Sequence, residues 1–389
     1  MKKKMMLTTV IVLAFGFLVL WLAPAILESQ MNIVLPHDSY EVSGEAQKLH
    51  DSLAIADLHS DSTLWKRDLL ERGTRGHVDI PRMREGNLAL QMFTTVTRSP
   101  RGQNYEKNSE DAFDNITLVA FIQSWPRATW NSLAARALYQ AEKLKSLQER
   151  APEQFQMVYS SADLARLLER RSSGEPVVGG LLGTEGSHAL DGELENIERL
   201  FSAGFRMMSL QHFFDNKLGG SLHGQSEAGL SLFGEQAVDE MLRLGVMIDV
   251  SHSSPAVVKD VLKRTQRPLI VSHTGFYGNC QSPRNISDDL MIAIANNGGL
   301  IGVGYWDAAI CTATLPGIVK AIRYGINLVG MEHVALGSDF DGSVATPLDT
   351  SELSALTQEM LSQGFSEEEI RAVMGENTMR FLMKNLPAR

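Results

Sequence analysis

The feature that most constrains the fold is an alternation, repeated along most of the chain, of short apolar runs with helical, charge-flanked stretches. Continuous apolar strands separated by helices predict parallel strands that are covered on both faces. Amphipathic stretches such as 196–203, 235–244 and 255–263 are the predicted helices. Eight units of this kind predict an α/β fold, a closed (β/α)8 barrel of the TIM type. The predicted strands are 55–56, 88–96, 177–182, 206–210, 246–250, 269–271, 300–304 and 334–336.

An open, doubly wound sheet is the alternative to a barrel. Its usual sign, a GxGxxG turn after the first strand, is missing, and no phosphate-binding P-loop occurs. Residues 108–150 form a long insert, predicted to be helical, between the second and third strands. Residues 351–389 are predicted to form a helical tail, in which Ser366 and the three acids after it resemble a helix start.

The amino terminus predicts export. Three lysines at positions 2–4 precede an uncharged stretch over residues 5–27, and Glu28 is the first acid. At about 1.5 Å per residue such a stretch can cross a hydrocarbon core of about 30 Å, with the lysines in the cytoplasm. A cleaved signal peptide, cut near Ala23-Pro24-Ala25, is the alternative. We therefore expect a membrane anchor or signal at 1–28, a polar tether at 29–48 and one domain at 49–389, outside the cytoplasm at a periplasmic or extracellular face.

Composition excludes several classes of protein. The 389 residues carry a formal net charge of −10 and no dense Lys/Arg block beyond residue 4. Nucleic-acid binding is therefore not expected, because contacts to phosphate need clustered cations. Two cysteines are too few for a disulfide-built scaffold or a four-cysteine zinc site.

Polar side chains stand where the predicted strands end. In a parallel barrel all these ends open on one mouth, so the side chains should meet there. Imidazole together with carboxylate suits zinc or another first-row metal, whereas calcium and magnesium prefer oxygen ligands throughout. Each of these residues alone could be an ordinary hydrogen-bonded or helix-capping group. Burying all of them together without a partner would cost free energy, which favours a metal site. The residues are His59, Asp61, Glu185, His212, His252, His273 and Asp339.

Other histidines carry weaker predictions. His188 is expected beside the site rather than as a ligand, and His77 either lines the mouth or braces a loop. Surface or loop positions are expected for the rest, which are His37, His50, His223 and His333.

The motifs together resemble the membrane dipeptidase (renal dipeptidase) family of zinc metallopeptidases. In order along residues 50 to 385 they read HSD, GTEGSH, SLQH, DVSH, VSHT, PRNISDD, GSDFDG and GENTMRFL. The resemblance implies a (β/α)8 barrel with two zinc ions, one bound by His59 and Asp61, the other by His252 and His273, with Glu185 bridging them. Many related amidohydrolases bridge instead with a lysine at the end of strand four, where this chain has no lysine.

The same resemblance implies how a dipeptide is bound and cleaved, with a hydroxide shared by the two metals as the nucleophile. His212 would stabilise the oxyanion, Arg284 would pair with the substrate's carboxylate, and Asp339 would engage its amino group and pass a proton to the leaving amine. The alternatives are a surface salt bridge for Arg284 and a helix cap for Asp339, and Asp341 could exchange roles with Asp339. Asp57 would orient a ligand. Acceptance of a C-terminal D-residue and a homodimeric state are left open.

Cys280 and Cys311 fall where some members of that family hold a disulfide; two separate buried thiols are the alternative. Residues 213–217, FFDNK, depart from the family pattern, so one side of the mouth is expected to be reshaped. A glycolipid anchor is not expected, because the C-terminus is charged.

Two other functions stay open. The first is a related binuclear metal amidohydrolase that acts on another amide, such as a β-lactam or an N-acyl amino acid. The second is a non-catalytic exported binding protein. Such a protein would be expected to lack at least one of the metal-binding side chains, whereas all five are present in this sequence.

Overall fold

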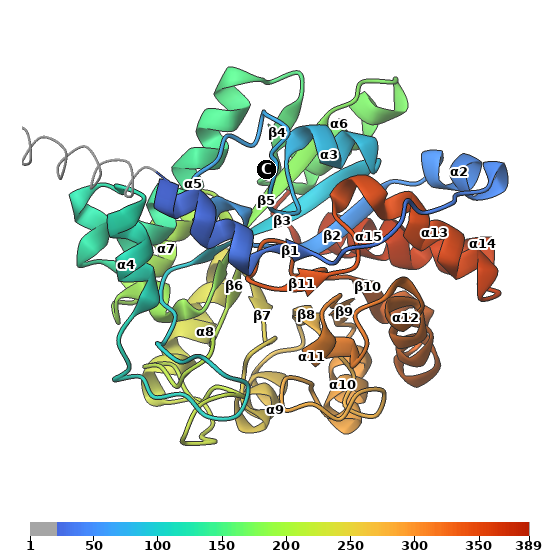
Figure 1. Ribbon diagram of the computed structural model, residues 1–389. Helices are drawn as coiled ribbons and strands as arrows, with labels where there is room; N and C mark the ends of the chain where they lie inside the picture. Colours follow the sequence, from blue (N-terminus) through green and yellow to red (C-terminus); the bar gives the residue numbers. More distant parts are fainter. Residues whose placement is uncertain (1–21, 389) are drawn as a thin grey trace, which may run out of the picture.

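A closed barrel of eight parallel strands forms the centre of the computed structural model, which describes residues 22–388 (Figure 1). Every neighbouring pair is parallel, and the β3–β5 pairing, from Leu90 opposite Gly179 to Val96 opposite Glu185, completes the ring. The predicted (β/α)8 barrel is thus confirmed. Its strands are β2 (Ile55–Ser60), β3 (Leu88–Val96), β5 (Val178–Glu185), β6 (Phe205–Ser209), β7 (Met247–Asp249), β8 (Ile270–Thr274), β9 (Leu300–Val303) and β10 (Val334–Leu336).

A ninth strand, β4 (Phe155–Met157), was not predicted and pairs with the first half of β5. Two glycines allow this crowding, because a Cβ on Gly180 would lie 2.2 Å from the Phe155 ring and one on Gly179 2.3 Å from Leu167. The second half of β5 is then free to pair with β6.

Helices surround the barrel and start at well-formed caps. The side chains of Ser231, Ser254 and Thr314 each accept a backbone N–H in the first turn of the helix that follows. Their apolar faces are buried against the strands, as periodicity predicts. The main outer helices are α3 (Ile80–Glu85), α6 (Ser161–Ser172), α7 (Glu195–Ser202), α8 (Leu232–Leu244), α9 (Pro255–Arg264), α10 (Asp288–Asn296) and α12 (Leu315–Val329).

The predicted insert is largely helical. It contains α4 (Asn115–Ile122), a 3-10 turn at Arg127–Trp130 and α5 (Leu133–Arg150). Buried Arg136 of α5 holds it together by donating to the carbonyl oxygens of Thr129 and Thr97, both at 2.7 Å.

The carboxyl-terminal tail is also helical as predicted, with α13 (Leu353–Ser362), α14 (Glu367–Arg371), a π-helical turn at Ala372–Glu376 and α15 (Asn377–Asn385). Ser366 and Glu369 form a capping box at the start of α14. Asn377 donates to the carbonyl of Val334 at 2.8 Å, which fixes the tail beneath the start of β10.

The amino-terminal part of the described chain lies against the barrel. Residues 22–31 are helical, β1 (Ile33–Val34) pairs with β11 (Ala345–Thr346), and α2 (Gly44–Asp51) packs on α13. The stretch expected to be a polar tether is therefore docked over much of its length. Most of the predicted anchor, residues 1–21, lies outside the described part. Within residues 22–388, no helix combines the length and apolarity needed to span a bilayer.

Candidate metal centre

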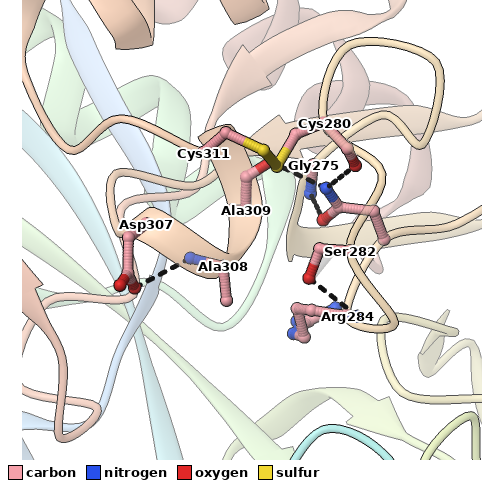
Figure 2. The surroundings of a disulfide bond; sticks show 9 residues. Gly275, Cys280, Ser282, Arg284, Asp307, Ala308, Ala309 and Cys311 are labelled. Atoms are coloured by element: carbon pink, nitrogen blue, oxygen red, sulfur yellow. Dashed lines mark hydrogen bonds between the residues drawn. A yellow bond between two sulfur atoms is a disulfide. The ribbon is translucent and has the colours of Figure 1, made fainter.

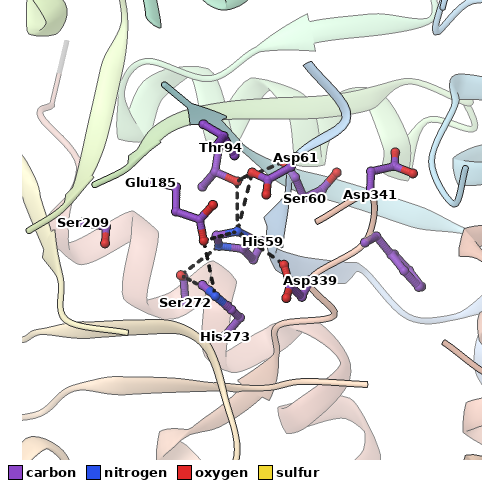
Figure 3. A network of polar contacts seen from close by, with 12 residues as sticks. His59, Ser60, Asp61, Thr94, Glu185, Ser209, Ser272, His273, Asp339 and Asp341 are labelled. Atoms are coloured by element: carbon purple, nitrogen blue, oxygen red, sulfur yellow. Dashed lines mark hydrogen bonds and ion pairs between the residues drawn. The ribbon is translucent and has the colours of Figure 1, made fainter. Parts of the chain in front are cut away.

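The polar residues predicted at the strand ends converge in one buried cluster at the mouth of the barrel. His59 lies in β2, Glu185 ends β5 and His273 lies in β8, whereas Asp61 directly follows β2 and Asp339 lies three residues after the end of β10. Figure 3 shows these five side chains pointing toward one another. None of them is more than 7% exposed, so the cluster is shielded from bulk water.

Glu185 occupies the middle of the cluster. Its Oε1 lies 3.3 Å from Nε2 of His252 and 3.5 Å from Nε2 of both His59 and His273. The Nε2 atoms of His252 and His273 are 3.0 Å apart, and His59 Nε2 is 3.7 Å from Asp61 Oδ1. One carboxylate thus contacts two groups of donors, His59 with Asp61 and His252 with His273.

These separations fit transition-metal ligands. Zinc binds nitrogen and oxygen donors at about 2.0–2.1 Å in a tetrahedron, which puts neighbouring donor atoms about 3.3 Å apart. The donor atoms of His59, Asp61 and Glu185 all lie within 4.8 Å of one another, as do those of Glu185, His212 and His252. The donor chemistry and spacing therefore fit metal ions of this kind.

The electrostatics of the cluster call for a cation. Burial, together with the nearby carboxylates of Asp61 and Asp339, raises the pKa of Glu185 well above its ordinary value. Burial likewise raises the pKa of Asp339 to about 7, with Asp61 adding to the shift. Burial alone lowers the pKa of His59, but Asp61 and Asp339 outweigh it and raise that pKa. A positive charge at this point is thus stabilised by its surroundings.

A single hydroxyl sets the tautomer of two imidazoles. Ser272 Oγ donates to buried Asp249 at 2.7 Å, so it can only accept from the Nδ1 atoms of His59 and His273, each 3.0 Å away. Both Nδ1 atoms therefore carry the proton and both Nε2 lone pairs face the cluster. Burial also lowers the pKa of His252 and of His273 well below the ordinary value, which keeps them neutral.

Asp57, predicted to orient a ligand, fixes the backbone of β2. Its Oδ1 accepts from the backbone N–H of His59 at 3.0 Å and from Gln91 at 2.9 Å, and its Oδ2 accepts from the N–H of Ser338 at 3.0 Å. One carboxylate therefore ties together the strand ends that carry His59 and Asp339.

The two aspartates after β10 differ in their surroundings. Both have φ of +62°, a left-handed conformation that Asp tolerates better than most residues. Asp339 lines the cavity and lies 3.8 Å from His59 Nε2, whereas Asp341 is fully buried against Arg67, Ser62 and the backbone N–H of His77. Burial alone raises the pKa of Asp341, but Arg67 and His77 hold it well below its usual range. Asp341 therefore braces the loop, as does His77.

Arg284 does not form a surface salt bridge, which was the alternative to its predicted role in substrate binding. Its guanidinium is buried and donates to the carbonyl oxygens of His273 at 2.8 Å and Ser251 at 3.2 Å, and to Thr274 at 3.3 Å. Across residues 22–388 no carboxylate forms an ion pair with it. Burial lowers its pKa. A buried guanidinium with only neutral partners is well suited to bind an anion.

His212 follows β6 and points at the cluster, with Nε2 3.3 Å from Glu185 Oε2. Its Nδ1 is 3.4 Å from the carbonyl of Arg98, too long to fix a tautomer. Burial lowers the pKa of His212 to about 4, so the ring is neutral near pH 7. His188, expected beside the site, stacks near His212 with ring centroids 6.4 Å apart.

One of the weaker histidine predictions, that for His50, was wrong, whereas His223 lies in a loop as expected. His50 is buried and bonds Thr357 at 2.9 Å. His223 is also buried, with Nδ1 2.9 Å from the carbonyl of Tyr105 and its ring 5.4 Å from that of His252. The loop that carries His223 folds back over the mouth, which local sequence does not reveal.

A cavity of about 310 Å³ connects the cluster with Arg284. Several of its lining residues were not predicted. Tyr105 lies in the loop between β3 and the predicted insert, and its hydroxyl accepts from Trp306 Nε1 at 3.0 Å; burial raises its pKa to about 12. Phe213, in the segment that departs from the family pattern, also lines the cavity, and its ring centroid is 5.6 Å from that of Tyr105. No pattern in the sequence around Tyr105 indicated its position.

Cys280 and Cys311 are joined in a disulfide (Figure 2). The bond links the loop that carries Arg284 to the end of α11 (Asp307–Ile310). Asn285 adds to this link by donating to the carbonyl oxygens of Cys280 at 2.9 Å and Ala309 at 2.8 Å. The loop that presents the guanidinium is thus held at two points.

Comparison with known proteins gives consistent matches. A family model described as membrane dipeptidase (peptidase family M19) matches residues 43–386. The chain is 29% identical over 355 residues to dipeptidase aclJ of Aspergillus oryzae, covering 84% of this chain and 77% of that protein.

Two solved structures share the fold. The probable dipeptidase PvdM from Pseudomonas aeruginosa has a TM-score of 0.72 at 19% identity and covers 88% of this chain and 97% of its own. A metallo peptidase from Rhodobacter sphaeroides, liganded with a phosphinate mimic of the dipeptide L-Ala-D-Ala, has a TM-score of 0.68 at 22% identity and covers 86% and 99%.

Proposed function

The chain belongs to the membrane dipeptidase family, and from that membership we propose that it hydrolyses dipeptides with the help of two zinc ions. In this proposal His59 and Asp61 hold one ion, His252 and His273 hold the other, and Glu185 bridges them. The central position of Glu185, within 3.5 Å of three imidazole nitrogens, supports the bridge. When bound, the metals would polarise the scissile carbonyl and lower the pKa of a water molecule.

Arg284 would bind the carboxylate of the substrate. Its fixed position, held by two backbone carbonyls, leaves a charge that needs an anion. Asp339, across the same cavity, would pair with the substrate's free amino group. A chain longer than a dipeptide, or one with blocked ends, would leave one of these buried charges unpaired, which predicts strong discrimination against it.

His212 and Asp339 would have different parts in the reaction. The neutral His212 ring would donate a hydrogen bond from Nε2–H to the carbonyl oxygen as negative charge develops there, and would keep its proton. The Asp339 carboxylate would take up the proton that the attacking water loses and pass it to the leaving amine. Ser272 and Asp249 would keep the Nε2 lone pairs of His59 and His273 directed at the metals.

We also propose that a C-terminal D-residue is accepted. The support is a related fold, the Rhodobacter sphaeroides peptidase, whose structure holds a mimic of L-Ala-D-Ala. Hydrolysis of L-Ala-L-Ala but not of L-Ala-D-Ala by the purified protein would exclude this part.

One observation carries the proposed function: a buried Arg284 without an ion pair shares one cavity with Asp339 and the donor cluster. The test combines metal analysis of the purified full chain with release of amino acids from free, N-acetylated and C-amidated dipeptides. Two zinc ions per chain and cleavage of the free dipeptides alone are expected. Equal cleavage of blocked substrates would contradict the assigned roles of Arg284 and Asp339 and favour a different amide as substrate.

For location, we propose that the domain is exported and held at the membrane by its amino-terminal segment. The Cys280–Cys311 disulfide supports an oxidising compartment, because such bonds rarely persist in the cytosol. Cell fractionation combined with thiol titration of the protein from its native host tests this. Cytosolic protein with two free thiols would overturn it.

A further inference from the structure

The cavity has two chemically different sides. The polar side contains the candidate metal centre and Arg284. The other side is an apolar wall formed by six residues from four parts of the chain, Leu27, Met31, Trp65, Ile116, Val119 and Val344. Outside the candidate centre and Arg284, no described side chain that lines the cavity is charged.

Part of this wall comes from the amino-terminal strap, defined here as residues 22–35. The strap is fixed from beneath by Glu28, which is fully buried and accepts from Arg67 Nε at 2.5 Å and Arg75 Nε at 2.7 Å. Leu27 packs into the apolar cluster around Trp65 and Ile116. These contacts hold the strap in place as part of the cavity wall.

The strap is attached to the loop that carries Asp339. Asn32 Oδ1 accepts from the backbone N–H of Ser343 at 2.9 Å, and the N–H of Ile33 donates to the carbonyl of Val344 at 3.1 Å. Figure 1 shows the strap, in dark blue, leading into β1 beside β11. The wall therefore borders the Asp339 end of the cavity.

The Arg284 end has different neighbours. The guanidinium lies 5.3 Å from the ring of Trp306, which in turn bonds Tyr105. With the substrate amine at Asp339 and its carboxylate at Arg284, the side chain of the first residue faces the wall and that of the second faces Tyr105.

We propose that the strap and the wall form the subsite for the side chain of the amino-terminal residue, and that the enzyme selects dipeptides with a large apolar residue there. This inference rests on the proposed function, which sets the substrate's direction. A Leu side chain would replace water against Leu27, Met31 and Trp65, whose indole N–H is already bonded to the carbonyl of Asp341 at 2.7 Å. A charged side chain would lose its hydration there and gain no partner of opposite charge, because the lining beside the wall is neutral among the described residues.

The strap lies before the family match, which begins at residue 43. The contribution of Leu27 and Met31 to the wall therefore comes from outside the matched region, whereas the other four wall residues lie within it.

The test measures kcat/KM of the zinc-loaded full chain for Leu-Gly, Ala-Gly, Glu-Gly and Gly-Leu. We expect Leu-Gly to exceed Ala-Gly by about tenfold or more, since a single methylene in a fitted pocket is worth about tenfold. Leu27→Ala should reduce this ratio, because kcat/KM should fall more for Leu-Gly than for Ala-Gly, and the circular dichroism spectrum of the variant reports correct folding. Ile26→Ala is the matched control, because Ile26 lies on the same helix, is 52% exposed and does not line the cavity.

A second variant tests for a gain of activity toward an acidic substrate. Met31→Lys should raise the rate with Glu-Gly relative to Leu-Gly about two- to fivefold, the range of an exposed ion pair, which misfolding cannot mimic. A preference that follows the second residue, or a Leu-Gly to Ala-Gly ratio unchanged by Leu27→Ala, would overturn the subsite while the dipeptidase activity stands. Failure to cleave any dipeptide with both metals bound would overturn the proposed function and this inference with it.

Discussion

Replacing Asp341 by Asn tests whether this residue braces the loop, in contrast to Asp339, which lies two residues earlier and has the proposed catalytic role. Asn has nearly the same shape and tolerates the left-handed backbone at φ +62°, so the substitution removes chiefly the charge. The charge matters because Asp341 and Glu28 together balance two guanidiniums, those of Arg67 and Arg75. Without it, the buried network holds one uncompensated positive charge.

The expected loss of stability is substantial. Removing one partner of a buried ion pair costs about 3–5 kcal/mol, and the remaining contact of Arg67 with Glu28 argues for the lower end, about 3 kcal/mol. An unfolding entropy of about 2.1 cal/mol/K per residue gives about 0.75 kcal/mol/K for a domain of this length. The melting temperature should therefore fall by about 4 °C.

Circular dichroism melts in the presence of a chelator measure this without a contribution from metal affinity. Because the pKa of Asp341 is held below its ordinary value, its contribution is present above the unfolded pKa of about 3.9 and is lost as pH falls through the folded value. The difference in melting temperature between Asp341→Asn and wild type should be constant from about pH 5 to 8 and shrink below about pH 4.

Asp339→Asn is the matched control. Asp339 faces the cavity and has a raised pKa, so this variant should lose activity and keep or gain stability. A melting temperature of Asp341→Asn equal to that of the wild type would contradict the bracing role of Asp341. Loss of activity at full zinc content and unchanged stability would contradict it as well.

Three further changes test other parts of the site. Glu185→Gln should keep the fold but bind fewer than two metal ions, as measured by mass spectrometry of the dialysed protein; full metal content would contradict the bridge. Arg284→Lys should raise KM about 10- to 100-fold at unchanged metal content, because lysine cannot form the two-pronged carboxylate contact; unchanged KM would remove the assignment. Replacing both Cys280 and Cys311 by Ser should cost about 3–4 kcal/mol in a urea titration, from the loop entropy of a 31-residue separation; equal midpoints would show that the crosslink adds no stability.

The barrel could be predicted because each of its units is local. A short apolar run and the amphipathic helix after it carry their own periodicity, and observed strands such as Leu88–Val96 match the predicted bounds. The convergence of Glu185 and His273 then follows from topology alone, because parallel strands end at one mouth. Disagreements are confined to short strands such as Phe155–Met157, whose pairing depends on a distant partner.

The surroundings of the site could not be predicted, because they depend on contacts between distant segments. Asp339 and Asp341 follow the same strand, and only the position of Arg67 tells them apart. Tyr105 reaches the cavity from the loop after β3 and Met31 reaches it from the strap, and neither has a local pattern that indicates it.

The attachment of the strap has a consequence for biosynthesis. Asn32 and Ser343, which join the strap to the barrel, are 311 residues apart in sequence. During translation the earliest of these residues leaves the ribosome long before its partner exists, and closing so large a loop is slow. The attachment of the strap thus forms late in synthesis, and a product that ends just before Ser343 would have all eight barrel strands without the contact that holds the strap beside them.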